Sequence, residues 1–180
     1  EFKARAWSWP AALLYAFFPS LAIRGPFGAA LKLWDEQLAS GKRVAAIGNS
    51  DAHGVTFHLG PIARVLFPYD YLFRCVNTHL LIDLPLTREI AADKRMVLDA
   101  LRAGRCFIGY DLPAPTRGFR FTATNGSDTA DMGGEIRRTG MVRFKISCPD
   151  YASIRLLCNG KLMAQTTDDH LDFQSLEPGA

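Results

Sequence analysis

The chain has 180 residues, of which 48% are hydrophobic and 22% are charged, and its formal net charge at pH 7 is +3. These proportions are ordinary for a globular protein that buries a real core as one domain or two small ones. The basic residues are spread along the chain instead of forming a stripe with aromatic residues, which argues against nucleic acid as a partner.

The first apolar stretch, residues 11–23, is thirteen residues long and is interrupted by Pro19. A membrane-spanning helix needs about 20 apolar residues, so we expect a buried helix and loop and no membrane partner. Association with a membrane interface is the alternative. The next element is a helix that Pro26 opens and Gly41 ends, because apolar residues follow one another at helical spacing between them.

The apolar run at residues 44–47, bounded by Arg43 and Gly48, predicts a buried parallel strand. Asp51 and His53 follow it two positions apart, so both side chains point to the same side of an extended segment. A carboxylate beside an imidazole is a typical pair of metal ligands. In the other interpretation, Ser50 or Asp51 caps a helix or builds a turn, and His53 is an ordinary surface histidine.

The pattern changes near residues 113–115. Before them we expect a β-prone segment at residues 71–82, a helix that Asp93 caps and Gly104 ends, and a short strand at residues 106–108. After them, apolar and polar residues alternate, and Asn159-Gly160 predicts a hairpin turn. The sequence thus predicts an α/β domain over residues 1–112 and a small antiparallel β lobe, a sheet or sandwich, over residues 116–180.

Three segments carry a resemblance to a known family. Residues 48–53 (GNSDAH) resemble the last metal-binding motif, G-[SN]-S-D-A-H, of the PHP (polymerase and histidinol phosphatase) superfamily. Residues 33–38 (LWDEQL) and 41–44 (GKRV) are similar to the helix and strand that precede this motif in the CehA/McbA-like branch. Residues 100–107 (ALRAGRCF) resemble its A-L-R-A-G-R-[ST]-F segment.

The resemblance implies that residues 1–112 are the C-terminal part of a β/α barrel with its active site at the strand ends. It implies a metal-dependent hydrolase of small molecules, most often phosphate esters and in some relatives amides or carbamates, that uses divalent zinc, manganese or iron. Asp51 and His53 would be metal ligands, and Asn49 and Ser50 would orient their loop. Since relatives continue past Pro178-Gly179, the β lobe is expected to be cut short.

The chain also departs from the family. An intact site begins with an H-x-H pair, which is missing here, and the four histidines are His53, His58, His79 and His170. We therefore expect this chain to supply one corner of a longer enzyme's site and to be inactive by itself. A non-catalytic structural or interaction module is the alternative.

The other histidines have two interpretations each. His58 lies on a predicted loop over the barrel mouth, where it contacts substrate or only water. His79 is a structural histidine or a pocket residue, and His170 belongs to a predicted turn after two aspartates. The β lobe buttresses the first domain or, in the alternative, binds substrate.

The four cysteines, Cys75, Cys106, Cys148 and Cys158, are widely spaced and form no C-x-x-C pair. This usage favours free thiols and a cytoplasmic protein over zinc or redox chemistry. Two disulfides in a secreted protein are the alternative.

Overall fold

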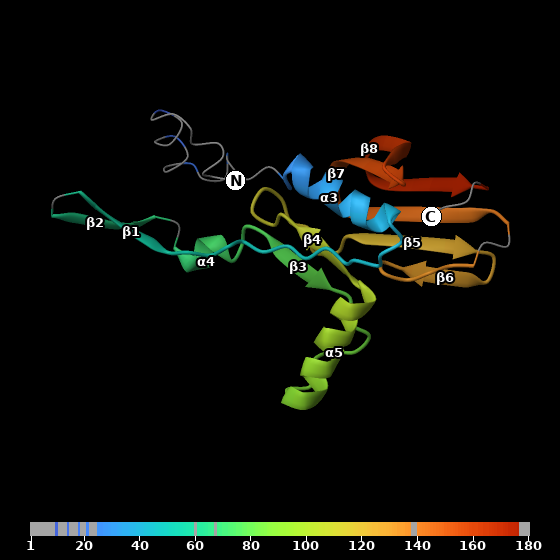
Figure 1. Ribbon diagram of the computed structural model, residues 1–180, viewed down its shortest axis with the longest axis horizontal. Coiled ribbons are helices and arrows are strands. Elements are labelled where there is room, and N and C mark those ends of the chain that lie inside the picture. Colours follow the sequence, from blue (N-terminus) through green and yellow to red (C-terminus); the bar gives the residue numbers. More distant parts are fainter. Residues whose placement is uncertain are drawn as a thin grey trace.

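Three antiparallel sheets and three helices make up the described part of this computed structural model (Figure 1). The structure describes residues 25–59, 61–66, 68–137 and 140–176, together with positions 10, 14, 18 and 21. In chain order the elements are α3 (Gly28–Ala39), β1 (Val55–Leu59), β2 (Ile62–Leu66), α4 (Tyr69–Leu72), β3 (Asn77–Leu80), α5 (Ile90–Ala103), β4 (Cys106–Gly109), β5 (Arg120–Asn125), β6 (Asp128–Asp131), β7 (Val142–Cys158) and β8 (Lys161–Ser175).

The largest sheet has the strand order β6-β5-β7-β8, and all its pairs are antiparallel. The predicted alternation is confirmed along β7, where Val142, Ile146, Ile154 and Leu156 are buried and their neighbours are more exposed. The predicted hairpin is also confirmed, since Cys158 pairs with Lys161 across Asn159-Gly160.

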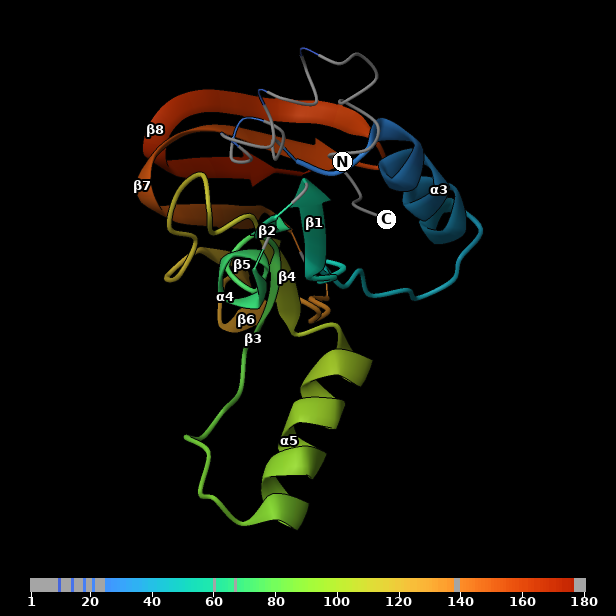
Figure 2. The ribbon, with the colours of Figure 1, turned by 90° about the vertical axis from the view of Figure 1, so that its left-hand side faces the viewer.

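The core lies inside the bent β7–β8 hairpin. Ile146 and Ile154 belong to one buried cluster, although eight residues of straight strand would place them about 26 Å apart. The register of β7 against β8 shifts between Ser147 and Ala152, and this irregularity lets the two halves of the hairpin fold toward each other (Figure 2). The lobe is therefore one folded sheet, and the four-residue irregularity determines where its core forms.

The predicted β/α barrel is wrong. The described residues form small open antiparallel sheets, β1-β2, β3-β4 and β6-β5-β7-β8, with few helices. Residues 43–48, the predicted buried parallel strand, are extended but belong to no sheet, and Ile47 is 68% exposed. Where this segment meets β3, at Gly48, its hydrogen bonds run to the Thr78 side chain and not to the backbone, so no strand ladder forms.

The two long helices form where the sequence predicts them, with corrections of detail. The apolar face of α3 is not covered, because none of its residues is buried. Helix α5 is capped by Glu89, whose carboxylate accepts hydrogen bonds from the backbone of Ala91 and Ala92. Asp93, the predicted cap, instead accepts the backbone N–H of Arg88. Gly104 ends the helix with φ 70°, as predicted.

The connector between the two predicted domains is exposed at residues 113–115. A ring contact spans it, since Phe107 of β4 lies 5.2 Å from Phe119, measured between centroids. Of the predicted helix and loop at residues 11–23, all but three positions lie outside the described residues. None of the helices in the described ranges is both long and apolar enough to cross a membrane. The four cysteines are free thiols.

The backbones of Gly104 and Gly133 come close together, although the two residues lie far apart in the sequence. A Cβ built on Gly133, whose φ is 78°, would lie 2.4 Å from the backbone carbon of Gly104 and 2.5 Å from the carbonyl oxygen of Ala103. We expect Gly133→Ala to lower the free energy of unfolding by about 2–3 kcal/mol, measured by urea denaturation. Gly126→Ala is the matched control, because Gly126 also has a positive φ but has nothing within 4 Å. Equal losses in both variants would contradict a close backbone contact.

Candidate functional site

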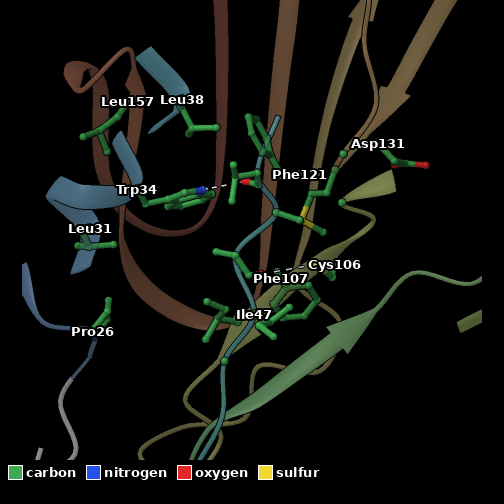
Figure 3. Close-up of a pocket in the computed structure, with 18 of the residues that line it drawn as sticks. Pro26, Leu31, Trp34, Leu38, Ile47, Cys106, Phe107, Phe121, Asp131 and Leu157 are labelled. Atoms are coloured by element: carbon green, nitrogen blue, oxygen red, sulfur yellow. Dashed lines mark hydrogen bonds between the residues drawn. The ribbon is translucent and has the colours of Figure 1, made fainter. Parts of the chain in front are cut away.

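The segment that carries the predicted ligands is fastened to three parts of the structure. Trp34 of α3 donates its indole N–H to the carbonyl oxygen of Val44, at 2.8 Å (Figure 3). Arg43 forms an ion pair with Glu135 at 2.6 Å. At the other end, the Thr78 hydroxyl of β3 accepts from the Gly48 N–H at 2.8 Å and donates to its carbonyl at 2.9 Å. These bonds fix the segment as an extended strap.

This strap forms one wall of a large open cleft of about 2490 Å³. The other walls come from α3, β4, β5, β7, β8 and from β6 with the turn that follows it, and most of the side chains that line the cleft are apolar (Figure 3). The strap, whose Ile47 is largely exposed, thus adds to an apolar surface that the described residues leave open. Asn49, Ser50, Asp51 and His53 lie along the lining as well. The predicted ligands therefore border a cleft whose walls are mainly apolar.

The structure brings Asp51 and His53 together. The Nδ1 atom of His53 lies 2.8 Å from the backbone carbonyl oxygen of Asp51 and 3.3 Å from its carboxylate oxygen Oδ1. Both side chains are exposed, Asp51 to 88% and His53 to 75%. The Asn49 side chain accepts the backbone N–H of Asp51 at 2.9 Å, and Asp51 has φ 48°. Asn49 thus stabilises a local turn that an aspartate tolerates well, and the orienting role of Asn49 and Ser50 stays a prediction.

This pair fits a metal ion only in part. A histidine that donates its Nδ1–H to a backbone carbonyl presents the lone pair of Nε2, an arrangement common among metal ligands. A catalytic ion nevertheless needs about three protein ligands, and the pair supplies two. In the described part of the chain, three convergent ligand-type side chains occur elsewhere, at residues 168–170. Asp51 and His53 by themselves cannot hold a catalytic ion firmly.

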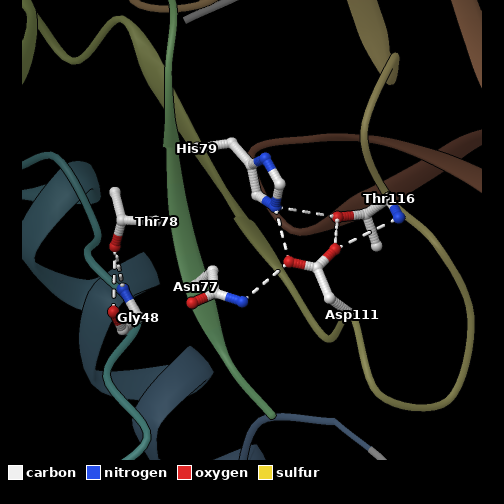
Figure 4. A network of polar contacts seen from close by, with 6 residues as sticks. All are labelled: Gly48, Asn77, Thr78, His79, Asp111 and Thr116. Carbon is white, nitrogen blue, oxygen red and sulfur yellow. Dashed lines mark hydrogen bonds and ion pairs between the residues drawn. The ribbon is translucent and has the colours of Figure 1, made fainter. Parts of the chain in front are cut away.

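His79 belongs to a separate polar network that sequence reasoning missed (Figure 4). The carboxylate of Asp111 lies 2.8 Å from His79 Nε2 and also accepts from the Asn77 amide at 2.8 Å. Thr116 donates its hydroxyl to the same carboxylate. The ring of His79 stacks on Phe107, with centroids 4.6 Å apart. Asp111, two residues after the end of β4, is the acidic residue that joins these groups, and its position just past a strand was the available signal.

Two observations favour a structural role for this network. Thr78 faces the strap, so its neighbours Asn77 and His79 point to the opposite side of β3, away from the loop that carries Asp51. Moreover, Nε2 of His79 contacts both Asp111 and the Thr116 hydroxyl, at 2.8 and 3.1 Å. A single nitrogen cannot give its proton to the carboxylate and also remove one from the hydroxyl, so His79 does not act as a base toward Thr116 in this arrangement.

Burial raises the pKa of Asp111, but hydrogen bonds from Thr116, Asn77 and His79 outweigh this effect and lower the pKa to about 2. The network also explains why residue 109 is glycine. A Cβ on Gly109 would lie 2.1 Å from the Thr116 hydroxyl oxygen. The group therefore joins β3, β4 and the connector at one point.

His58 lies in a different setting from the predicted one. It does not sit on a loop but in β1, whose backbone pairs with β2 in a hairpin that projects from the rest of the chain (Figure 1). Its side chain is outside the described part of the structure. The predicted contact of His58 with substrate therefore stays a prediction.

The prediction of a turn at His170 is wrong, because Asp168, Asp169 and His170 lie within β8. The Nδ1 atom of His170 is 2.7 Å from Asp169 and 3.5 Å from Asp168. The hydrogen bond to Asp169 and the two negative charges raise the pKa of His170. These three side chains are largely in water, where acidic clusters are common without any ion, and the group stands here only as an exposed polar cluster.

No family model, curated protein or solved structure matches this chain.

Proposed function

We propose that this chain contributes two metal ligands, Asp51 and His53, to a metal-dependent hydrolase of small phosphate esters. The proximity of the two side chains at the exposed edge of the cleft supports this proposal most directly, with a distance of 3.3 Å between His53 Nδ1 and Asp51 Oδ1. In this proposal the remaining ligands come from other polypeptide, so we expect the chain to have no catalytic activity by itself.

The chain's own residues have defined tasks in this proposal. Asp51 would bind the metal through its carboxylate, and His53 would bind through Nε2 while its Nδ1–H stays on the Asp51 carbonyl. Asn49 holds the turn between them. Zinc, manganese and iron suit such a mixed donor set, and a bound divalent ion supplies hydroxide near neutral pH and positive charge for phosphoryl oxygens.

A second candidate function is a non-catalytic interaction module, and the open cleft favours it. An exposed apolar surface that continues from α3 across the strap is unusual for a protein that works alone. In this alternative Asp51 and His53 are ordinary surface residues that form a turn, and no metal is needed.

Measuring metal content and hydrolytic turnover on the same samples distinguishes the two functions. We expect the purified chain, stripped of metal and then supplied with Mn²⁺ or Zn²⁺, to hydrolyse p-nitrophenyl phosphate and its diester no faster than the metal alone. A longer polypeptide that contains this chain and supplies further metal ligands is expected to retain metal through gel filtration and to turn over a phosphate ester.

Robust turnover by the chain alone would contradict the inference that two ligands are too few. A longer polypeptide that retains no metal and shows no turnover would contradict the hydrolase and leave the interaction module.

A further inference from the structure

The chain contains two Asn-Gly pairs, and the structure places them in opposite surroundings. Both follow strands of the main sheet: Asn125-Gly126 lies at the end of β5, and Asn159-Gly160 lies between β7 and β8. Asparagine is a chemically labile residue, and a following glycine has no Cβ to hinder attack by its backbone nitrogen. The two asparagines therefore have the same intrinsic reactivity toward this attack, and any difference between their rates in the folded protein comes from their surroundings.

Asn125 is held. It is 8% exposed, its backbone pairs with Asp128 in the ladder, and its side-chain amide donates to the carbonyl oxygen of Arg137. The side-chain nitrogen, which this reaction must expel, is thus hydrogen-bonded to Arg137, and the side-chain carbon that would be attacked is kept in place. Reaction at this residue requires the end of β5 to open and the buried hydrogen bond to break.

Asn159, in contrast, lies exposed at the tip of a hairpin. It is exposed and forms a two-residue loop with Gly160, outside the strand ladder that ends at Cys158 and Lys161. Its φ is 51° and that of Gly160 is 74°, as a tight hairpin turn requires. In the part of the chain that the structure describes, no hydrogen bond of its side chain holds the amide. A hairpin tip of this kind opens locally at low free-energy cost.

We propose that Asn159 is a site of spontaneous deamidation in the folded protein and that Asn125 is protected from it. The Gly160 backbone nitrogen attacks Cγ of Asn159, a C–N bond forms, and the side-chain nitrogen leaves as ammonia with the proton from Gly160. Water then opens the resulting succinimide at one of its two carbonyl carbons, which leaves aspartate or isoaspartate at this position.

The product changes the hairpin. Isoaspartate inserts one extra carbon into the main chain of a two-residue turn, so Cys158 and Lys161 can no longer pair in the same register. Leu156, a core residue, lies two positions before this pair. Deamidated molecules therefore lose amide-exchange protection at the turn end of β7 and β8 first.

The test is peptide mapping by mass spectrometry during incubation of the folded chain at pH 8.5. We expect deamidation at Asn159 to be at least about tenfold faster than at Asn125, a ratio that one broken buried hydrogen bond is enough to produce. In denaturant the two sites should react at similar rates, because only the fold distinguishes them. Asn159→Gly keeps the hairpin turn and should keep amide protection throughout the incubation.

Equal rates at the two sites in the folded chain would overturn the proposal. So would an unmodified Asn159 after a time in which the denatured chain has reacted fully.

Discussion

Replacing Asp51 with alanine is expected to abolish the metal-dependent turnover of a hydrolase that contains this chain. Removal of one of few carboxylate ligands weakens the hold on the ion and removes negative charge that fixes its position, so we expect a loss of about 10³-fold or more in kcat/KM. Because the Asp51 side chain is 88% exposed, the free energy of unfolding should change by less than about 0.5 kcal/mol.

The control is Asp99→Ala on α5, which removes an exposed carboxylate that pairs with Arg102 at 3.1 Å. This variant should keep both metal content and turnover. The measurement is metal content after gel filtration together with hydrolysis of a phosphate ester, for wild type and both variants. Wild-type turnover by Asp51→Ala would contradict the assignment of Asp51 as a ligand.

Loss of Asp111 is expected to have the largest effect on stability. Its carboxylate accepts from Asn77, Thr116 and His79, so Asp111→Ala leaves several half-buried polar groups without their acceptor. We expect the free energy of unfolding to fall by about 2–4 kcal/mol at pH 7, measured by urea denaturation. Asp99→Ala again serves as the control and should lose about 0.5 kcal/mol or less.

The same variant should change the dependence of stability on pH. The pKa of Asp111 is about 2 in the folded protein and 3.8 in its ordinary state, so its stabilising contribution is complete above about pH 4. The contribution is lost as the pH falls from about 4 to about 2, because the carboxylate must then be protonated. Because the network is partly exposed and solvent screens its charges, we expect the free energy of unfolding to fall by about 1–2 kcal/mol over this range.

Hydrogen bonds also lower the pKa of other carboxylates, such as those of Asp93 and Asp172, so these groups contribute to the acid limb of the wild type as well. The difference between wild type and Asp111→Ala isolates the share of Asp111. If the two proteins lose stability in parallel between pH 4 and 2, the network does not depend on this carboxylate.

The sequence by itself predicts the features that depend on a few neighbouring residues. It predicts the left-handed turn at Asn159-Gly160, the helix end at Gly104, the alternation along β7 and the closeness of Asp51 to His53. Each of these depends on the conformational preference of one residue or on a fixed spacing along the backbone, and neither requires a partner from far along the chain.

Tertiary structure alone decided what these elements pack against. The apolar run at residues 44–47 predicts burial, but it does not specify a neighbour, and because these residues join no sheet Ile47 stays exposed. The partnership of His79 with Asp111 joins residues 32 positions apart, and the contact of Gly104 with Gly133 depends on how α5 meets the turn after β6. Such contacts depend on which segments meet in space. The energy of burial is non-directional, and the conformational preferences of residues act only on their near neighbours, so neither specifies a partner far along the chain.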